Sequence, residues 1–460
     1  MAGGVITAYE FDRLLQGTPG GGDEAGIASV PRPMFEWLER QCFLEGRTTP
    51  WIRPARWRGQ RALQLTSHVG VIQSPDGTRL EILPKAARGM GGAAEARRLL
   101  VAMLRCLPEF RHLRAGQADQ LAVRMPLPEV FIAEFLARVK DVVKRGLRGD
   151  YIAREANLDA LRGKLLVSEQ LRRNSLRLDR FFTAHDEFSI DRAENRLLHA
   201  GLQRVLQQST SRKNQQLARE LAFAFADVPA SKVPASDLAR TRIERGMVFY
   251  GEALAWVRLI LEGRSPVPGC GSNPAPALLF PMDALFEAFV ARHLAKQLPQ
   301  GVRLSAQYQG ECLASCEGAP YLRLRPDLLL RRGPDVCMVL DTKWKLLDTS
   351  AGATGGSGLS AADFYQLNAY GQAYLQGRGE MALVHPMTEA FSAPLEFQLT
   401  HSPELRLWVL PFCLVTARLR LPERLASALG WADQNAQVSS SATRPSARLA
   451  SPTDSATTSL

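Results

Sequence analysis

Two stretches, Leu324-Arg-Pro-Asp-Leu-Leu-Leu330 and Val336-Cys-Met-Val-Leu-Asp-Thr-Lys-Trp344, decide the fold of the C-terminal half of this chain. Each contains a run of apolar residues, which is typical of a strand buried in a sheet. The segment between them, Arg331-Arg-Gly-Pro-Asp335, combines Gly and Pro and therefore predicts a turn. The two stretches are thus expected to form a β-hairpin.

The register of this hairpin determines where its two aspartates lie. A turn centred on Pro334 places Asp327 directly opposite Asp341, and a turn centred on Gly333 makes Asp341 the diagonal neighbour of Asp327. Both registers bring the carboxylates close together, where they would repel each other without a shared cation. Because carboxylate oxygens, water and substrate phosphate are the usual ligands of Mg²⁺, the hairpin predicts a magnesium site formed by both aspartates.

Lys343 lies two residues beyond Asp341, so the period of a strand places both side chains on the same face. Its ammonium group could orient or activate an attacking water and offset the charge that grows on a phosphodiester. The alternative is an exposed Asp341–Lys343 ion pair of little energetic value. The neighbouring apolar runs favour a functional site, with Asp327, Asp341 and Lys343 as catalytic residues.

With Pro326-Asp327 and Asp341-Thr-Lys343, the hairpin resembles the PD-(D/E)xK nucleases. The resemblance implies a Mg²⁺-dependent endonuclease that cuts DNA, and it implies supporting roles for three further residues. Glu287 stands where these nucleases often carry an acidic residue on a helix before the sheet, although it could be an ordinary helix-edge glutamate. Gln366 and Tyr370, four residues apart on one helix face, resemble a pair that supports the active site, although they could be plain helix surface.

More narrowly, residues 65–415 resemble the McrC family, the nuclease subunits of McrBC modification-dependent restriction systems. The motifs that carry this resemblance are Val69-Gly-Val-Ile72, Leu80-Glu-Ile-Leu-Pro-Lys85, Gly146-Leu-Arg-Gly-Asp-Tyr151, Leu161-Arg-Gly-Lys-Leu165, Asp186-Glu-Phe-Ser189, Glu194-Asn-Arg-Leu-Leu198, Leu285-Phe-Glu-Ala-Phe-Val290, Arg325-Pro-Asp327, Leu340-Asp-Thr-Lys343 and Tyr365-Gln-Leu-Asn-Ala-Tyr370.

The family resemblance implies a division of labour between two polypeptides. A McrB-like AAA+ GTPase recognises modified cytosine, such as 5-methylcytosine, and translocates double-stranded DNA. The McrC-like chain docks into that ring by its N-terminal part, stimulates hydrolysis and cuts the DNA. Self-association of this chain within the complex is a further possible interaction. This sequence contains no Gly-x-x-x-x-Gly-Lys-[Ser/Thr] phosphate loop, so GTP is expected to bind to the partner.

The fold class expected for the whole chain is α/β, or α+β overall, in four parts. Residues 1–124 should form a β-rich partner-docking domain, and residues 125–262 a mostly helical basic region. Residues 263–425, which begin with a Gly/Pro-rich segment, should form a restriction-endonuclease-like domain with a mixed central sheet. Residues 426–460, rich in Ser, Thr and Ala, should be a disordered tail.

Composition narrows the class of protein and its compartment. With 57 Lys and Arg against 46 Asp and Glu, the net charge of +11 favours a polyanionic partner such as nucleic acid. Seven irregularly spaced cysteines do not make a disulfide framework. The N-terminus lacks the features of a signal peptide, and no apolar run approaches the ~18 residues that span a bilayer. A cytoplasmic protein without membrane contact is expected.

Two other functions are compatible with the same sequence. The chain could be a non-enzymatic adaptor that binds DNA and activates an NTPase, or a stand-alone repair nuclease of the same fold. The presence of both aspartates and the lysine argues against the adaptor. The long segment before the nuclease hairpin, with its family-like motifs, would be superfluous in a stand-alone nuclease.

Overall fold

The computed structural model describes residues 5–18, 25–43, 51–88, 91–110, 121–122, 125–262, 277–350 and 358–431. The Gly/Pro-rich segment 263–276 and most of the expected tail lie outside these ranges. The chain divides into two compact units: Met1–Arg292 with Thr342–Leu346, and His293–Asp341 with Leu347–Leu460. No helix in the described part is long and apolar enough to cross a membrane.

The first unit begins with two four-stranded sheets that share an apolar core with helix α1. In the first sheet, β7 lies between β1 and β6 and is buried along its whole length. Strands β6 and β7 pair antiparallel as a hairpin, and Gly77 adopts a φ of +87° in its turn. The elements, in sheet order, are β1 (Val5–Tyr9), β7 (Arg79–Leu83), β6 (His68–Gln73) and β11 (Ala277–Pro281); then β3 (Ile27–Val30), β2 (Arg13–Gln16), β5 (Gln60–Leu65) and β4 (Ile52–Trp57); and α1 (Arg32–Cys42).

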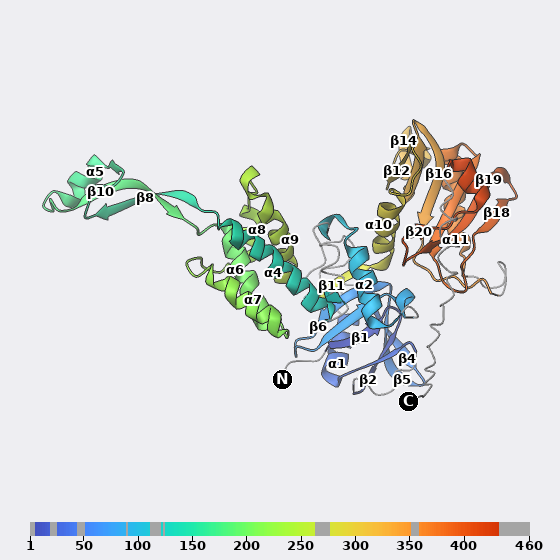
Figure 1. Cartoon of the computed structure of the whole chain (residues 1–460), viewed down its shortest axis with the longest axis horizontal. Helices are drawn as coiled ribbons and strands as arrows, with labels where there is room; N and C mark the ends of the chain where they lie inside the picture. Colours follow the sequence, from blue (N-terminus) through green and yellow to red (C-terminus); the bar gives the residue numbers. More distant parts are fainter. Residues whose placement is uncertain are drawn as a thin grey trace, which may run out of the picture. The chain divides into compact units, whose positions relative to one another are not determined.

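Helices make up most of the remainder of this unit, and α4, α6, α7 and α9 pack against one another (Figure 1). A glycine permits one close approach, because a Cβ at Gly201 would lie 2.4 Å from Val257 and 2.8 Å from Phe135. The helices are α2 (Ala93–Leu104), α4 (Leu127–Arg145), α6 (Ala193–Gln208), α7 (Arg212–Phe223), α8 (Pro234–Arg240) and α9 (Val248–Glu262).

Residues 150–189 form a long β-ribbon, here called the arm, that interrupts the expected helical region (Figure 1). Its two long strands pair along nine residues each, from Asp150 opposite Ser189 to Leu158 opposite Phe181. These strands were not predicted from the sequence, because half of their side chains are exposed and neither strand shows an apolar alternation. The elements are β8 (Asp150–Leu158), β9 (Lys164–Leu165), α5 (Val167–Asn174) and β10 (Phe181–Ser189).

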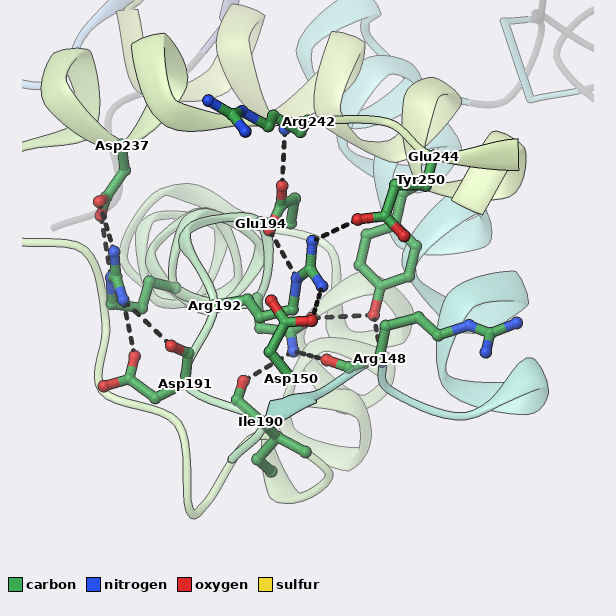
Figure 2. A network of polar contacts seen from close by, with 12 residues as sticks. Arg148, Asp150, Ile190, Asp191, Arg192, Glu194, Asp237, Arg242, Glu244 and Tyr250 are labelled. Carbon is green, nitrogen blue, oxygen red and sulfur yellow. Dashed lines mark hydrogen bonds and ion pairs between the residues drawn. The ribbon is translucent and has the colours of Figure 1, made fainter. Parts of the chain in front are cut away.

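A polar network fastens both ends of the arm to the helices (Figure 2). The amide group of Asn195, on α6, donates to the carbonyls of Arg148 and Ile190, which flank the two strands. The hydroxyl of Tyr250, on α9, donates to Asn195 over 2.8 Å and accepts from the backbone N–H of Arg148 over 3.0 Å. Arg192 adds ion pairs to three carboxylates of this region. The family-like motifs at 146–151 and 194–198 therefore contribute residues that attach the base of the arm to the helices.

The second unit contains a mixed sheet with the order β12-β15-β16-β17-β19-β18 and β20 beside β19. The β17–β19 pair is parallel, whereas β12–β15, β15–β16 and β18–β19 are antiparallel. The expected α/β class is confirmed. The elements are β12 (Val302–Ala306), β13 (Cys312–Cys316), β14 (Ala319–Arg323), β15 (Leu328–Arg332), β16 (Asp335–Thr342), α11 (Ala361–Leu375), β17 (Gly379–Pro386), β18 (Leu395–Leu399), β19 (Ser402–Cys413), β20 (Arg418–Leu419) and α12 (Glu423–Leu429).

Two boundaries differ from those expected from the sequence. Strand β11 pairs with β6 of the first sheet, and the first unit continues to Arg292, within α10 (Met282–Leu294), instead of ending at residue 262. The apolar residues of β11 complete a sheet that lies far back in the sequence, which a local composition change cannot show. Helix α12 also extends beyond residue 425, where the tail was expected to begin, and buries Leu425 and Leu429.

Candidate active site

The ladder between β15 and β16 fixes the register of the predicted hairpin. Next to the turn, Arg332 pairs with Asp335, and a bulge after Leu330 then shifts the pairing by one residue. From there Leu330 pairs with Met338 and Leu328 with Leu340. Continued by one residue, this register sets Asp327 against Asp341, which is the arrangement predicted for a turn centred on Pro334.

The two aspartates occupy the end of this ladder within the second unit. Asp341 is the penultimate residue of β16 and is only 2% exposed, whereas Asp327 immediately precedes β15 and is half-buried. Both offer hard carboxylate oxygens, the ligand type that Mg²⁺ prefers. No group of three or more His, Cys, Asp and Glu residues that could hold a metal occurs in the described ranges. A two-carboxylate donor set nevertheless fits Mg²⁺, which usually keeps several waters.

Helix α11 braces the irregular backbone that leads to Asp327. The side-chain amide of Gln366 donates to the Tyr370 hydroxyl over 2.8 Å, and that hydroxyl donates to the carbonyl of Arg325 over 3.0 Å. Tyr374, one turn further along, donates to the carbonyl of Leu324 over 2.9 Å. The structure thus brings Gln366 and Tyr370 together beside the Pro-Asp segment. Tyr374 was missed, although its four-residue spacing from Tyr370 was a visible signal.

Lys343 follows β16 in a short segment, Thr342–Leu346, that belongs to the first unit. The N–H of Lys345 donates to the Lys343 carbonyl over 2.9 Å, which closes a three-residue γ-turn centred on Trp344. The Trp344 ring is 5% exposed and packs on Phe286 of α10, with ring centroids 5.3 Å apart. Glu287, the predicted acidic residue, is the next residue of α10 and is half-buried. Sequence reasoning missed Trp344, which directly follows the Asp-x-Lys motif.

A buried carboxyl group contacts the same segment from the start of the chain. Glu10, which directly follows β1, is 1% exposed, and its Oε1 accepts a 2.6 Å hydrogen bond from Trp344 Nε1. The backbone N–H of Lys85 donates to the same oxygen over 3.1 Å. Burial raises the pKa of Glu10 to about 7, although the charge of Lys85 opposes this shift. No sequence signal could have linked Glu10 to a motif more than three hundred residues away.

The family description "McrBC 5-methylcytosine restriction system component" matches residues 63–386, which is more than half of the chain. The chain belongs to this family. The matched segment contains all six predicted site residues, whereas Glu10 lies outside it. Among curated proteins, none matches the sequence.

Two solved structures from Thermococcus gammatolerans are similar to the chain. One is described as a refined half-complex from a tetradecameric assembly of McrB AAA+ hexamers with bound McrC; it is 20% identical, with a TM-score of 0.66 over 93% of this chain and 99% of that chain. The other, a cryo-EM structure of the McrBC complex, is 21% identical, with a TM-score of 0.48 over 65% of this chain and 89% of that chain. The first of these similarities shows that this family member shares a fold with the matched chain.

The raised pKa of Glu10 makes a prediction about stability. Between its usual pKa of 4.5 and about 7, the folded protein holds a proton that the unfolded chain has lost. The free energy of unfolding of the wild type should therefore fall as pH rises through this range, by about 3 kcal/mol in total. Glu10→Gln removes this titration. The difference between the Tm of the variant and the Tm of the wild type should therefore rise in favour of the variant from pH 4.5 to 7 and stay constant above pH 7. Calorimetry of both proteins across pH 4.5–8 tests this, and a Tm difference that does not change with pH would contradict it.

Proposed function

We propose that this family member is the DNA-cutting subunit of a modification-dependent restriction complex. The observation that carries the proposal is the β15–β16 register, which pairs Leu328 with Leu340. Continued by one residue, this register would bring Asp327 opposite Asp341, and Lys343 lies two residues further along the chain. Two hard carboxylates and an ammonium group form a set suited to hydrolysis of a phosphodiester. The family match supports a role in restriction, and the residues support the choice of the nuclease subunit.

Asp327 and Asp341 would hold Mg²⁺, which when bound polarises a phosphoryl oxygen and lowers the pKa of a coordinated water. Lys343 contributes a positive charge that offsets the charge growing on the phosphate, and it can orient the attacking water. Gln366 and Tyr370 hold the backbone before Asp327 through the Arg325 carbonyl. Glu287 is proposed as a further supporting carboxylate.

The partner in this proposal is a McrB-like AAA+ GTPase that reads modified cytosine in double-stranded DNA. In the similar T. gammatolerans assembly, McrC is bound to McrB hexamers, which supports this choice. Docking is proposed through residues 1–124. A second contact with the partner is proposed at the arm. Its Leu176 and Leu178 are 96% and 90% exposed, the highest values among large apolar side chains in the described ranges.

Reconstitution tests the whole proposal. The chain, a McrB-like GTPase, GTP and Mg²⁺ are combined with plasmid DNA that does or does not carry 5-methylcytosine. We expect double-strand cleavage of the methylated plasmid and little or none of the unmethylated plasmid. Stimulated GTP hydrolysis without any cleavage would instead identify a non-enzymatic adaptor, and cleavage that needs neither partner nor GTP would identify a stand-alone nuclease.

A further inference from the structure

Trp344 is held in three ways within the first unit. Its indole N–H donates to Glu10, its ring packs on Phe286, and the hydrogen bond between Lys345 and Lys343 closes the turn around it. Because Trp344 is the central residue of this turn, fixing its side chain also fixes the backbone that carries Lys343. A lysine side chain has four flexible carbons, so the placement of its ammonium group depends strongly on where its Cα is held.

The turn that presents Glu10 is itself rigid. Glu10 donates its backbone N–H to the Leu83 carbonyl over 2.9 Å. Asp12 donates its own N–H to the Tyr9 carbonyl and accepts from the Tyr9 N–H through its side chain, over 3.0 and 2.8 Å. Arg88 pairs with the other oxygen of Asp12. Glu10 therefore projects from a fixed support between β1 and β2, not from a mobile loop.

The energetics argue that Glu10 has a role beyond stability. Its pKa of about 7 shows that the site disfavours the ionised carboxylate. Its Oε1 accepts two hydrogen bonds, whereas its Oε2 is buried and has no hydrogen-bond partner among the residues that the structure describes. An apolar residue of similar volume would avoid this cost. The favourable contributions that remain are the charge of Lys85 and the two hydrogen bonds to Oε1, of which the bond from the indole of Trp344 is the shorter.

We infer that Glu10 is a positioning residue for DNA cleavage, because its hydrogen bond to Trp344 fixes the turn that carries Lys343. This inference rests on the proposed function, in which Lys343 is the catalytic cation. It assigns part of the nuclease machinery to the N-terminal sheet, outside the segment that matches the family. The contact would act through Lys343 alone, since Glu10 need not touch DNA or metal.

Three variants in the reconstituted complex test this inference. Trp344→Phe keeps an aromatic ring, although a smaller one, and removes the N–H donor. Glu10→Ala removes the acceptor, and Glu10→Gln keeps an acceptor oxygen. Since a misplacement of 1 Å can cost about a hundredfold, Trp344→Phe and Glu10→Ala should lower single-turnover cleavage at saturating DNA by about tenfold to a hundredfold. Glu10→Gln should restore most of the rate, and the DNA concentration for half-maximal rate should stay unchanged throughout. The Glu10→Ala/Trp344→Phe double variant should be no slower than the slower single variant, because the two substitutions remove the same hydrogen bond.

Trp51→Phe is the matched control, because Trp51 is a 3% exposed tryptophan in the core of the same N-terminal sheets. It should destabilise the unit without slowing cleavage. Wild-type cleavage by Trp344→Phe, or an equal loss in Trp51→Phe, would overturn the positioning role while leaving the proposed function intact. Wild-type cleavage by Asp341→Ala would overturn the proposed function, and the inference with it. If Glu10→Ala does not fold, Trp344→Phe and Glu10→Gln still decide the question.

Discussion

Replacement of Asp341 or Lys343 by Ala should reduce DNA cleavage by at least about a hundredfold, because metal binding and charge stabilisation at a phosphodiester each contribute several kcal/mol. Asp341 is nearly inaccessible near the end of β16, and its removal takes away one of the two carboxylates proposed to hold Mg²⁺. Stimulation of GTP hydrolysis by the partner should remain at the wild-type level, since neither substitution changes a residue of the proposed docking region, 1–124.

Asp335→Ala provides the matched control for this experiment. Asp335 is an exposed aspartate at the other end of β16, beside the turn, and lies outside the proposed site. It should cleave DNA at the wild-type rate. Wild-type rates in Asp341→Ala or Lys343→Ala would refute the assignment of the site, and equal losses in Asp335→Ala would point to a general defect of the sheet.

Without its partner, the chain in the presence of Mg²⁺ should bind DNA weakly and cut almost none of it. The net charge of +11 attracts phosphates without regard to sequence, and such binding weakens steeply as salt is added. The sequence has no phosphate loop with which to move along DNA or to control its own site. Phosphate contacts position a protein on DNA but do not select a sequence.

The measurement is cleavage of plasmid DNA across a salt series, with and without the GTPase and GTP. We expect the partner and GTP together to raise the cleavage rate by at least about a hundredfold, which corresponds to roughly 3 kcal/mol of barrier. DNA affinity of the chain alone should fall as salt rises from low to physiological concentration. Rapid cleavage by the isolated chain at physiological salt would favour a stand-alone nuclease.

Features that depend on neighbours in the sequence were predictable. A turn and two apolar runs predicted the β15–β16 hairpin and left two registers open, and the spacing of Gln366 and Tyr370 placed them on one helix face. The bulge after Leu330 was not foreseen; it shifts the pairing by one residue and gives the register expected for a turn centred on Pro334. Local patterns specify such pairs because short loops leave few alternatives.

Features that depend on distant segments could not be read in this way. Glu10 is an ordinary polar residue in sequence, and only folding brings it to Trp344. The arm was interpreted as helical because its strands carry no apolar alternation, and its identity depends on pairing between residues that lie 23 to 39 positions apart in the sequence. Strand β11 looked like the start of a new domain because its pairing partner lies about two hundred residues earlier.

The place of β11 in the first sheet restricts how such genes can recombine. A crossover in the Gly/Pro-rich segment, where the chain looks easiest to divide, would combine β6 of one parent with β11 of the other. A β11 that failed to pair would leave the edge of β6 open to aggregation. The backbone of β11 also has to fit closely against β6 at Gly70, because a Cβ at this position would lie 1.9 Å from the Leu278 carbonyl oxygen. Viable chimaeras between relatives should therefore inherit β6 and β11 from one parent.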